Sequence, residues 1–237
     1  MKPHYFLLLF CFLFTFSVVG QDKKKGVPNL KTFDERPLHF GFLIGFNAMD
    51  FRVYNSGVRN DINENNTRYA DVIHLKPGLN IGIVSSLRLN KHFNLRFLPG
   101  ISFGQRDIWY IDENGVKEER PLEIKSTFLE FPLLLKYSGL RMQNVRPFLV
   151  GGFNTRFDLA KNKQDHLLLN SLDGYIEAGG GFDFYLVYFR LSVELKTSIG
   201  LANVLNTKGT GEPEDIIYTQ TIDKLKSRIF TLTFYFE

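Results

Sequence analysis

The stretch FLEFPLLLKYSG, residues 128 to 139, places charges on either side of a strongly apolar run. Pro132 has no backbone N–H and its ring would clash inside a helix, so the run is interpreted as an extended strand. Alternate residues of a strand point to opposite faces. Glu130 and Lys136 share one face. The opposite face is wholly apolar or aromatic and consists of Leu129, Phe131, Leu133, Leu135 and Tyr137. This strand needs an apolar environment on one side and a polar one on the other.

Residues 1–20 have the features of a secretory signal peptide. A basic residue precedes an apolar run over residues 5–19, which contains only Thr15 and Ser17 as polar residues, and small residues stand just before the expected cleavage site after Gly20. The run is shorter than the roughly 20 apolar residues with which a helix spans a bilayer. Cys11, the single cysteine of the chain, lies inside this segment. The mature chain therefore offers neither a disulfide framework nor a thiolate metal site.

Residues 21–37 differ in composition from the rest of the chain. They contain the lysine run 23–25 together with glycine and proline, which predicts a flexible periplasmic N-terminal arm. The formal net charge of the whole chain is only +4, and no other basic block stands out. Nucleic acid is therefore not an expected partner.

Period-two alternation of apolar and polar residues recurs along residues 38–237, and no helical period of useful length appears there. Strands are expected at about 38–54, 72–90, 93–109, 122–138, 145–160, 173–186, 187–203 and 226–237. Pro77, Pro99, Pro132 and Pro147 lie inside these segments, and each would remove a ladder hydrogen bond unless it sits at a bulge or an edge. The alternation continues on both sides of each proline, so the strands are retained.

The connections between these strands alternate in length. Those at 90–92, 139–144 and 186–187 are short, whereas the others are long and polar, at 55–71, 110–121, 161–172 and 204–225. This pattern predicts an all-β fold, an eight-stranded antiparallel transmembrane β-barrel of the outer-membrane type, with short periplasmic turns and long extracellular loops. The expected location is the outer membrane of a Gram-negative bacterium, where lipid surrounds the barrel.

A soluble barrel with its apolar face inward is the alternative that alternation alone leaves open. An eight-stranded interior is just wide enough for side chains, and the many phenylalanines of the apolar face would overfill it. The glycines fall largely on the charged face, where space would be short. Tyrosine and tryptophan gather near strand ends, as in the two aromatic girdles of a membrane barrel. These residues are Tyr54, Tyr69, Trp109, Tyr110 and Tyr218 toward the long loops, and Tyr137, Tyr185, Tyr188 and Tyr235 toward the short turns.

Three stretches carry a resemblance to a known family: DERPLHFGFLIGFNAMDFR at 34–52, STFLEFPLLLKY at 126–137 and VRPFLVGGFN at 145–154. The last two look like a hairpin shared by many small outer-membrane barrels. Together with the first, and over essentially the whole mature chain, they resemble the PorT family of outer-membrane barrels. The resemblance implies participation in type IX secretion, the export of folded cargo proteins across the outer membrane, with other components of that system as partners.

The polar face carries a candidate network of charged side chains. A charge buried without a partner is costly, so these residues are expected to pair across the barrel interior. They are Arg88, Arg96, Glu130, Lys136, Arg156, Glu177, Asp183, Arg190, Glu194 and Lys196, with Glu194 expected between Arg190 and Lys196. Lys76, Arg106, Arg146 and Asp158 share the face. A path for ions or polypeptide is the alternative role, but eight strands leave no aqueous channel.

No catalytic or cofactor-binding constellation is expected. The mature histidines are scattered along the predicted topology, and no nucleophile, base and orienting acid converge. No small-molecule substrate, cofactor or metal is implied, so the protein is expected not to be an enzyme. A barrel that binds an extracellular ligand or surface, as an adhesin does, and a lipid-modifying hydrolase remain alternatives. The polar loops 61–71 and 206–224 and the N-terminal arm are equally open as docking surfaces.

The predicted topology can be tested by cysteine labelling, because the mature chain has no cysteine of its own. Cysteines introduced at Asn66 and Gly209 in the long loops are expected to react with a membrane-impermeant maleimide on intact cells. One introduced at Asn90 in a short turn should not react, because that turn faces the periplasm. Labelling at position 90 alone would invert the topology.

Overall fold

The computed structural model describes residues 28–55, 69–71, 76–111, 122–159, 171–203 and 222–237. A short 3-10 helix, η1 (Phe33–Glu35), precedes the strands. The strands are β1 (Leu38–Asn55), β2 (Tyr69–Asp71), β3 (Pro77–Arg88), β4 (Phe93–Phe97), β5 (Gly100–Ile111), β6 (Leu122–Ser138), β7 (Val145–Asp158), β8 (Leu172–Tyr185), β9 (Arg190–Gly200) and β10 (Ile222–Phe236). The described residues include no helix of the length and apolarity needed to cross a membrane.

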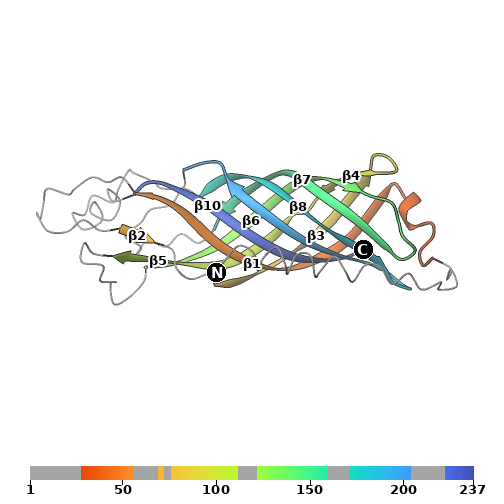
Figure 1. The fold of residues 1–237 in the computed structure, drawn as a ribbon, viewed down its shortest axis with the longest axis horizontal. Helices are drawn as coiled ribbons and strands as arrows, with labels where there is room; N and C mark the ends of the chain where they lie inside the picture. The colour runs from red at the N-terminus through yellow and green to blue at the C-terminus, as the bar shows by residue number, and fades with distance from the viewer. Residues whose placement is uncertain (1–27, 56–68, 72–75, 112–121, 160–170, 204–221) are drawn as a thin grey trace, which may run out of the picture.

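All strand pairs are antiparallel, and the sheet closes because β1 pairs with β10 on one side and with β3 on the other. β4 and β5 are two parts of one barrel strand, since both pair with β6 and with β3 in unbroken register. β2 pairs with the part of β5 beyond β3. The wall is thus an eight-stranded antiparallel barrel, which confirms the predicted fold (Figure 1).

Several strand ends differ from those expected by a few residues, and two of the differences have an identifiable cause. The strand predicted over 93–109 is interrupted at Leu98 and Pro99, because Pro99 has no N–H to give to the ladder. The connection expected at 186–187 is a longer turn, 186–189, closed by a hydrogen bond of 3.0 Å from the N–H of Leu186 to the carbonyl of Phe189. Pro132 and Pro147 remain inside β6 and β7.

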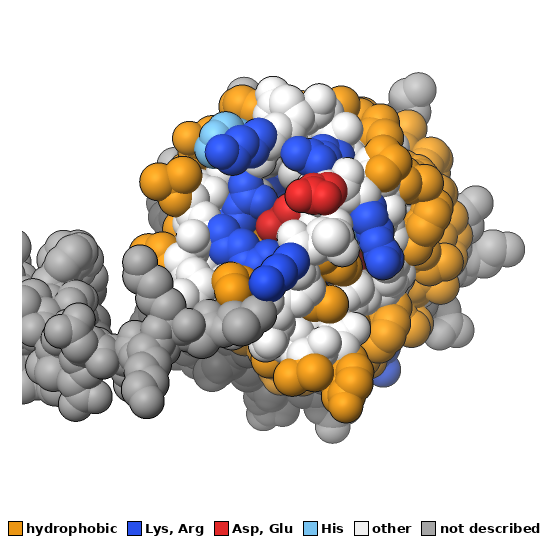
Figure 2. Space-filling view, turned by 90° about the vertical axis from the view of Figure 1, so that its right-hand side faces the viewer, with side chains coloured by type: hydrophobic (Ala, Val, Ile, Leu, Met, Phe, Trp, Pro, Cys, Tyr) orange, Lys and Arg blue, Asp and Glu red, His pale blue; other side chains and the backbone are white. Residues whose placement is uncertain are grey.

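The two faces of the wall separate as the alternation predicts. On β6, Glu130 and Lys136 are buried in the lumen, while Leu133 and Leu135 are exposed on the outer surface. Figure 2 shows hydrophobic side chains around the rim of the barrel and charged ones within it. The outer surface is therefore the apolar band that a lipid bilayer requires.

The expected aromatic girdles are only partly present. Tyr137 and Tyr188 are exposed on the outer surface, but Tyr185 and Tyr235 are each 1% exposed and point into the lumen, so their assignment to a girdle is wrong. Both lie at inward positions of the alternation, and their hydroxyls reach the carboxylates of Asp34 and Glu194. The side chains of the tyrosines and the tryptophan expected at the other girdle lie outside the described part of the chain.

The short turns 89–92, 139–144 and 186–189 meet at one end of the barrel, which we call the turn end, and the opposite end is the loop end. Residues 28–37 also lie at the turn end (Figure 1, red to orange). The amide nitrogen of Asn29 donates to Asn144 at 2.8 Å, and its side chain donates to the carbonyl of Tyr185 at 3.0 Å. This part of the arm expected over 21–37 is therefore docked on the barrel rather than free; residues 21–27 lie outside the described residues.

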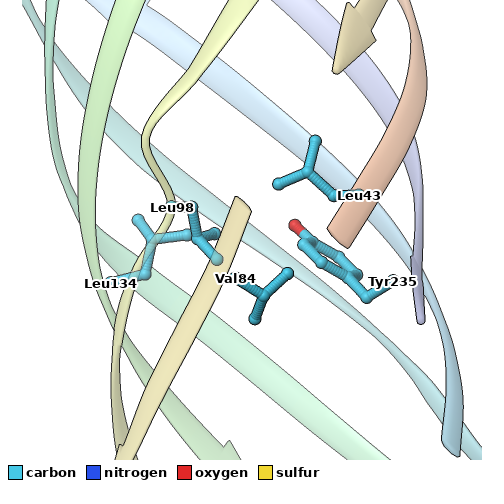
Figure 3. Close-up of a cluster of buried hydrophobic side chains, with 5 residues drawn as sticks. All are labelled: Leu43, Val84, Leu98, Leu134 and Tyr235. Atoms are coloured by element: carbon cyan, nitrogen blue, oxygen red, sulfur yellow. The ribbon is translucent and has the colours of Figure 1, made fainter. Parts of the chain in front are cut away.

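Apolar side chains fill part of the lumen. One cluster joins β1, β3, β6 and β10 with the segment between β4 and β5, and consists of Leu43, Val84, Leu98, Leu134 and Tyr235 (Figure 3). A second cluster consists of Met49, Phe128, Tyr175 and Ile229. The interior is thus a packed core of mixed polarity, as an eight-stranded barrel of this width demands.

Inward glycines are needed where the lumen is crowded. A Cβ at Gly181 would clash with the carbonyl oxygen of Val193 and lie 2.9 Å from Cζ of Phe148. Gly151 on the outer face is the control, because the nearest atom to a Cβ there is the carbonyl oxygen of Glu177 at 3.8 Å. Gly181→Ala is expected to lower the free energy of unfolding by about 1–3 kcal/mol through overpacking. The folded band of Gly181→Ala on a semi-native gel should convert at a lower temperature than that of Gly151→Ala; equal temperatures would contradict the crowding.

Candidate functional site: the charged lumen and its mouth

Glu177 on β8 is the centre of the charged network in the middle of the barrel. Its carboxylate lies 2.6 Å from Nζ of Lys196 and 3.0 Å from Nη2 of Arg156, and it accepts a hydrogen bond of 2.9 Å from the amide of Asn154. Nε of Arg156 also lies 3.1 Å from Glu130 on β6. The residues come from four adjacent strands, β6 to β9, so the network links one half of the wall from inside.

A second set of ion pairs lies closer to the turn end. Nζ of Lys136 lies 2.7 Å from Asp183, and Nη1 of Arg96 lies 3.3 Å from Glu194, which also accepts a hydrogen bond of 2.7 Å from the hydroxyl of Tyr235. β4, which carries Arg96, and β9, which carries Glu194, are not neighbours in the sheet. This pair therefore crosses the lumen. Each of its two buried charges has an opposite charge beside it, which a charge inside a protein requires.

The mouth at the turn end is closed by Asp34 of η1. Its carboxylate lies 3.5 Å from Arg141, 3.6 Å from Arg146 and 3.7 Å from Arg190, and it accepts a hydrogen bond of 2.8 Å from the hydroxyl of Tyr185. Figure 2 shows acidic side chains in the middle of this mouth with basic ones around them. Asp34 thus holds the N-terminal segment over the lumen.

Ring contacts and a second carboxylate complete the closure. Phe33 stacks on His39 at 4.4 Å between ring centroids, and the guanidinium of Arg190 lies 4.6 Å from the ring of Phe33. The Glu237 carboxylate lies 2.5 Å from Arg190. Burial opposes ionisation of Glu237, but Arg190 and Arg96 outweigh it and lower the pKa of this carboxyl to about 2. Glu237 is therefore a fixed negative charge at neutral pH.

Arg106 lies toward the loop end and is held differently. Its guanidinium donates to the hydroxyls of Ser126 at 2.6 Å and Ser227 at 3.0 Å, and lies 3.9 Å from the ring centroid of Phe51. Among the described residues, no carboxylate lies within ion-pair distance of it. Hydroxyls and an aromatic face thus replace a counter-ion at this level.

Among the described residues, a small cavity lies beside these groups. A cavity of about 20 Å³ is lined by Glu130, Arg156, Lys196, Thr231 and Tyr235, among others. Such a volume has room for about one water molecule. The described residues contain no group of three or more His, Cys, Asp or Glu that could hold a metal ion. The arrangement is thus suited to stabilising and sealing the barrel.

The structure places nine of the ten predicted network residues inside the barrel or at its mouth. Arg88 is the exception: it lies at the last position of β3, where the lumen ends, and its Nε donates to the carbonyl of Asn90 at 3.4 Å. Glu194 does not bridge Arg190 and Lys196 as expected, because these pair more closely with Glu237 and Glu177. Its ion-pair partner is Arg96.

Sequence reasoning missed Asp34, Glu237, Tyr185 and Tyr235 as parts of the network. The tyrosines had a signal, since both lie in the inward phase of their strands. Asp34 had none, because it precedes the first strand and no periodic pattern includes it.

Removal of the Glu194 carboxylate tests the network. Glu194→Ala leaves Arg96 and the hydroxyl of Tyr235 without their buried acceptor, and we expect a loss of about 3 kcal/mol in unfolding free energy. Glu35→Ala is the control, since Glu35 is exposed at the turn end. On semi-native gels, the folded band of Glu194→Ala should be lost at a lower temperature than that of Glu35→Ala. Equal heat resistance would show that Glu194 does not face the lumen.

Among solved structures, the chain is similar to the outer membrane protein OprG from Pseudomonas aeruginosa, with 12% identity, a TM-score of 0.42, and coverage of 90% of this chain and 96% of that one. It is also similar to Ail, the attachment invasion locus protein of Yersinia pestis, with 12% identity, a TM-score of 0.34, and coverage of 83% and 96%. A search of curated proteins finds no significant match.

The family model for the outer membrane protein β-barrel domain matches residues 20–206, which is most of the chain. The apolar outer band, the closed sheet and this match place the barrel in the outer membrane. The chain belongs to the outer membrane protein β-barrel domain family.

Proposed function

We propose that this barrel is a non-enzymatic component of the type IX secretion system, in which folded cargo proteins cross the outer membrane. The proposal is supported by the resemblance of residues 34–52, 126–137 and 145–154 to the PorT family. In this proposal, residues 1–20 are the signal peptide that directs export, and the partners are other components of the secretion system.

The filled lumen is the observation that supports an accessory mode of action for such a component. The ion pair of Arg96 with Glu194 crosses the interior, apolar side chains occupy space beside it, and Asp34 is bound over the mouth. The cavity beside Glu130 has room for about one water molecule, which is far too little for a folded protein. We therefore propose an accessory role, in which the barrel assembles with or supports a larger translocon.

The same proposal implies that the barrel contacts its partner proteins through its surface. A filled barrel acts on other proteins through its loops, its turn end or its lipid-facing wall, because nothing reaches a partner through its interior. We infer that the secretion role depends on these surfaces and not on transport through the lumen.

Deletion of the gene is the test of the secretion role. Type IX cargo is expected to accumulate in the periplasm with its C-terminal signal uncleaved, while other outer-membrane proteins remain correctly inserted. A plasmid copy of the wild-type gene should restore export, and Glu35→Ala should restore it equally, since this exposed residue contributes nothing to the lumen. Immunoblots of periplasmic and secreted fractions provide the measurement.

Two results would contradict parts of the proposal. Normal cargo export in the deletion strain would remove the secretion role and favour a barrel that binds an extracellular ligand. The purified barrel is expected to pass little or no current across a planar bilayer, because the lumen is filled. A large, stable conductance would leave a transport role open but would defeat the accessory mechanism.

A further inference from the structure

The turn end carries far more positive than negative charge. This end consists of segments 28–39, 88–92, 139–146 and 186–190 together with residue 237. The cations are Lys31, Arg36, Arg88, Lys91, Arg141, Arg146 and Arg190. The carboxylates are Asp34, Glu35 and Glu237. The side chains of the described part of this surface thus carry four more positive than negative charges.

Three arginines of this set lie over the lumen, and nearby carboxylates already neutralise part of their charge. Asp34 is shared by Arg141, Arg146 and Arg190, and Glu237 lies against Arg190. Two side-chain carboxylates therefore face the guanidiniums of three arginines, so these inner residues keep a net positive charge. Because Asp34 belongs to the N-terminal segment, these arginines already bind a carboxylate that comes from outside the barrel wall.

The exposed cations of the described turn end, which form the outer layer, have no carboxylate paired with them. Lys31, Arg36 and Lys91 are exposed, and among the described residues none of them makes an ion pair. The carbonyl of Lys91 accepts a hydrogen bond of 2.8 Å from Arg146, which joins the outer layer to the inner one. The carbonyl of Pro37, next to Arg36, accepts one of 2.8 Å from the N–H of Arg88. The backbones that carry these cations are thus fixed to the barrel.

The position of the cations indicates the kind of partner. Figure 2 shows most of the basic side chains of this face inside the ring of hydrophobic ones. A lipid headgroup would meet cations at the rim, beside the apolar band, whereas cations over the lumen face water. An acidic segment of a protein in the aqueous phase fits this arrangement, because complementary charge steers and orients such a partner.

We propose that the turn end is a docking surface for an acidic protein segment, which binds Lys31, Arg36 and Lys91 above the arginines that hold Asp34. In the predicted topology this surface faces the periplasm, so the partner is a periplasmic protein or domain. The proposal does not depend on the secretion role, since it rests on the charge and geometry of the turn end alone.

The test uses the full mature barrel in neutral detergent and a fluorescently labelled polyglutamate peptide, with binding followed by fluorescence anisotropy. The peptide is expected to bind, and its affinity should fall as salt is added. Arg36→Glu combined with Lys91→Glu should weaken binding roughly tenfold, because two attractive contacts become repulsive. Lys125→Glu is the matched control, since it reverses an exposed lysine on β6 toward the loop end.

Further variants and probes separate the outcomes. Lys91→Arg keeps the charge and should bind the peptide as the wild type does, and Lys31→Glu provides a second reversal should the double variant fail to fold. Labelled polylysine is expected not to bind. Equal binding of polyglutamate and polylysine, or an equal loss for Lys125→Glu, would overturn the proposal. Displacement of the peptide by micelles containing phosphatidylglycerol would also overturn it, since it would assign these cations to lipid.

Discussion

The backbone of a strand inside hydrocarbon finds no water, so each N–H and C=O that faces along the sheet needs a partner in another strand. Here that requirement is met by the pairing of β1 with β10, which runs from Phe42 opposite Phe236 to Asn55 opposite Ile222. The rest of the structure follows from this closure. A closed wall has one inner and one outer face, and the alternation of side chains assigns every residue of a strand to one of them.

Closure with eight strands also sets the width of the interior. At this width the lumen is filled by its own side chains, so charges inside it must pair with one another. The pairs formed by Glu177, Asp183 and Glu194 meet this need, and aromatic rings cover cations such as Arg96, whose guanidinium lies 4.1 Å from the ring centroid of Tyr235. Inward glycines such as Gly181 leave the space that these long side chains occupy.

Local pattern predicted most of the wall, because a period of two is a property of each strand by itself. The inward position of Glu130 and the outward position of Leu133 follow from it directly. The partners of each charge do not, since they depend on register and on strands that face each other across the lumen. Glu194 was therefore assigned to its sequence neighbours, whereas its ion-pair partner is Arg96 on a distant strand. Asp34 lies before the first strand, where no period exists to place it.

The contacts of the N-terminal segment constrain the order in which parts of the barrel fold. Asp34 precedes every strand, yet its partners Arg141, Arg146 and Arg190 stand on the turns and strands from β6 onward. Contacts so distant in sequence form late, because a long stretch of chain must be ordered first. The complete set of contacts over the mouth can therefore form only after β9 is in place. An incompletely assembled barrel would leave Asp34 without all of its partners, so the fully docked segment distinguishes a finished molecule from an unfinished one.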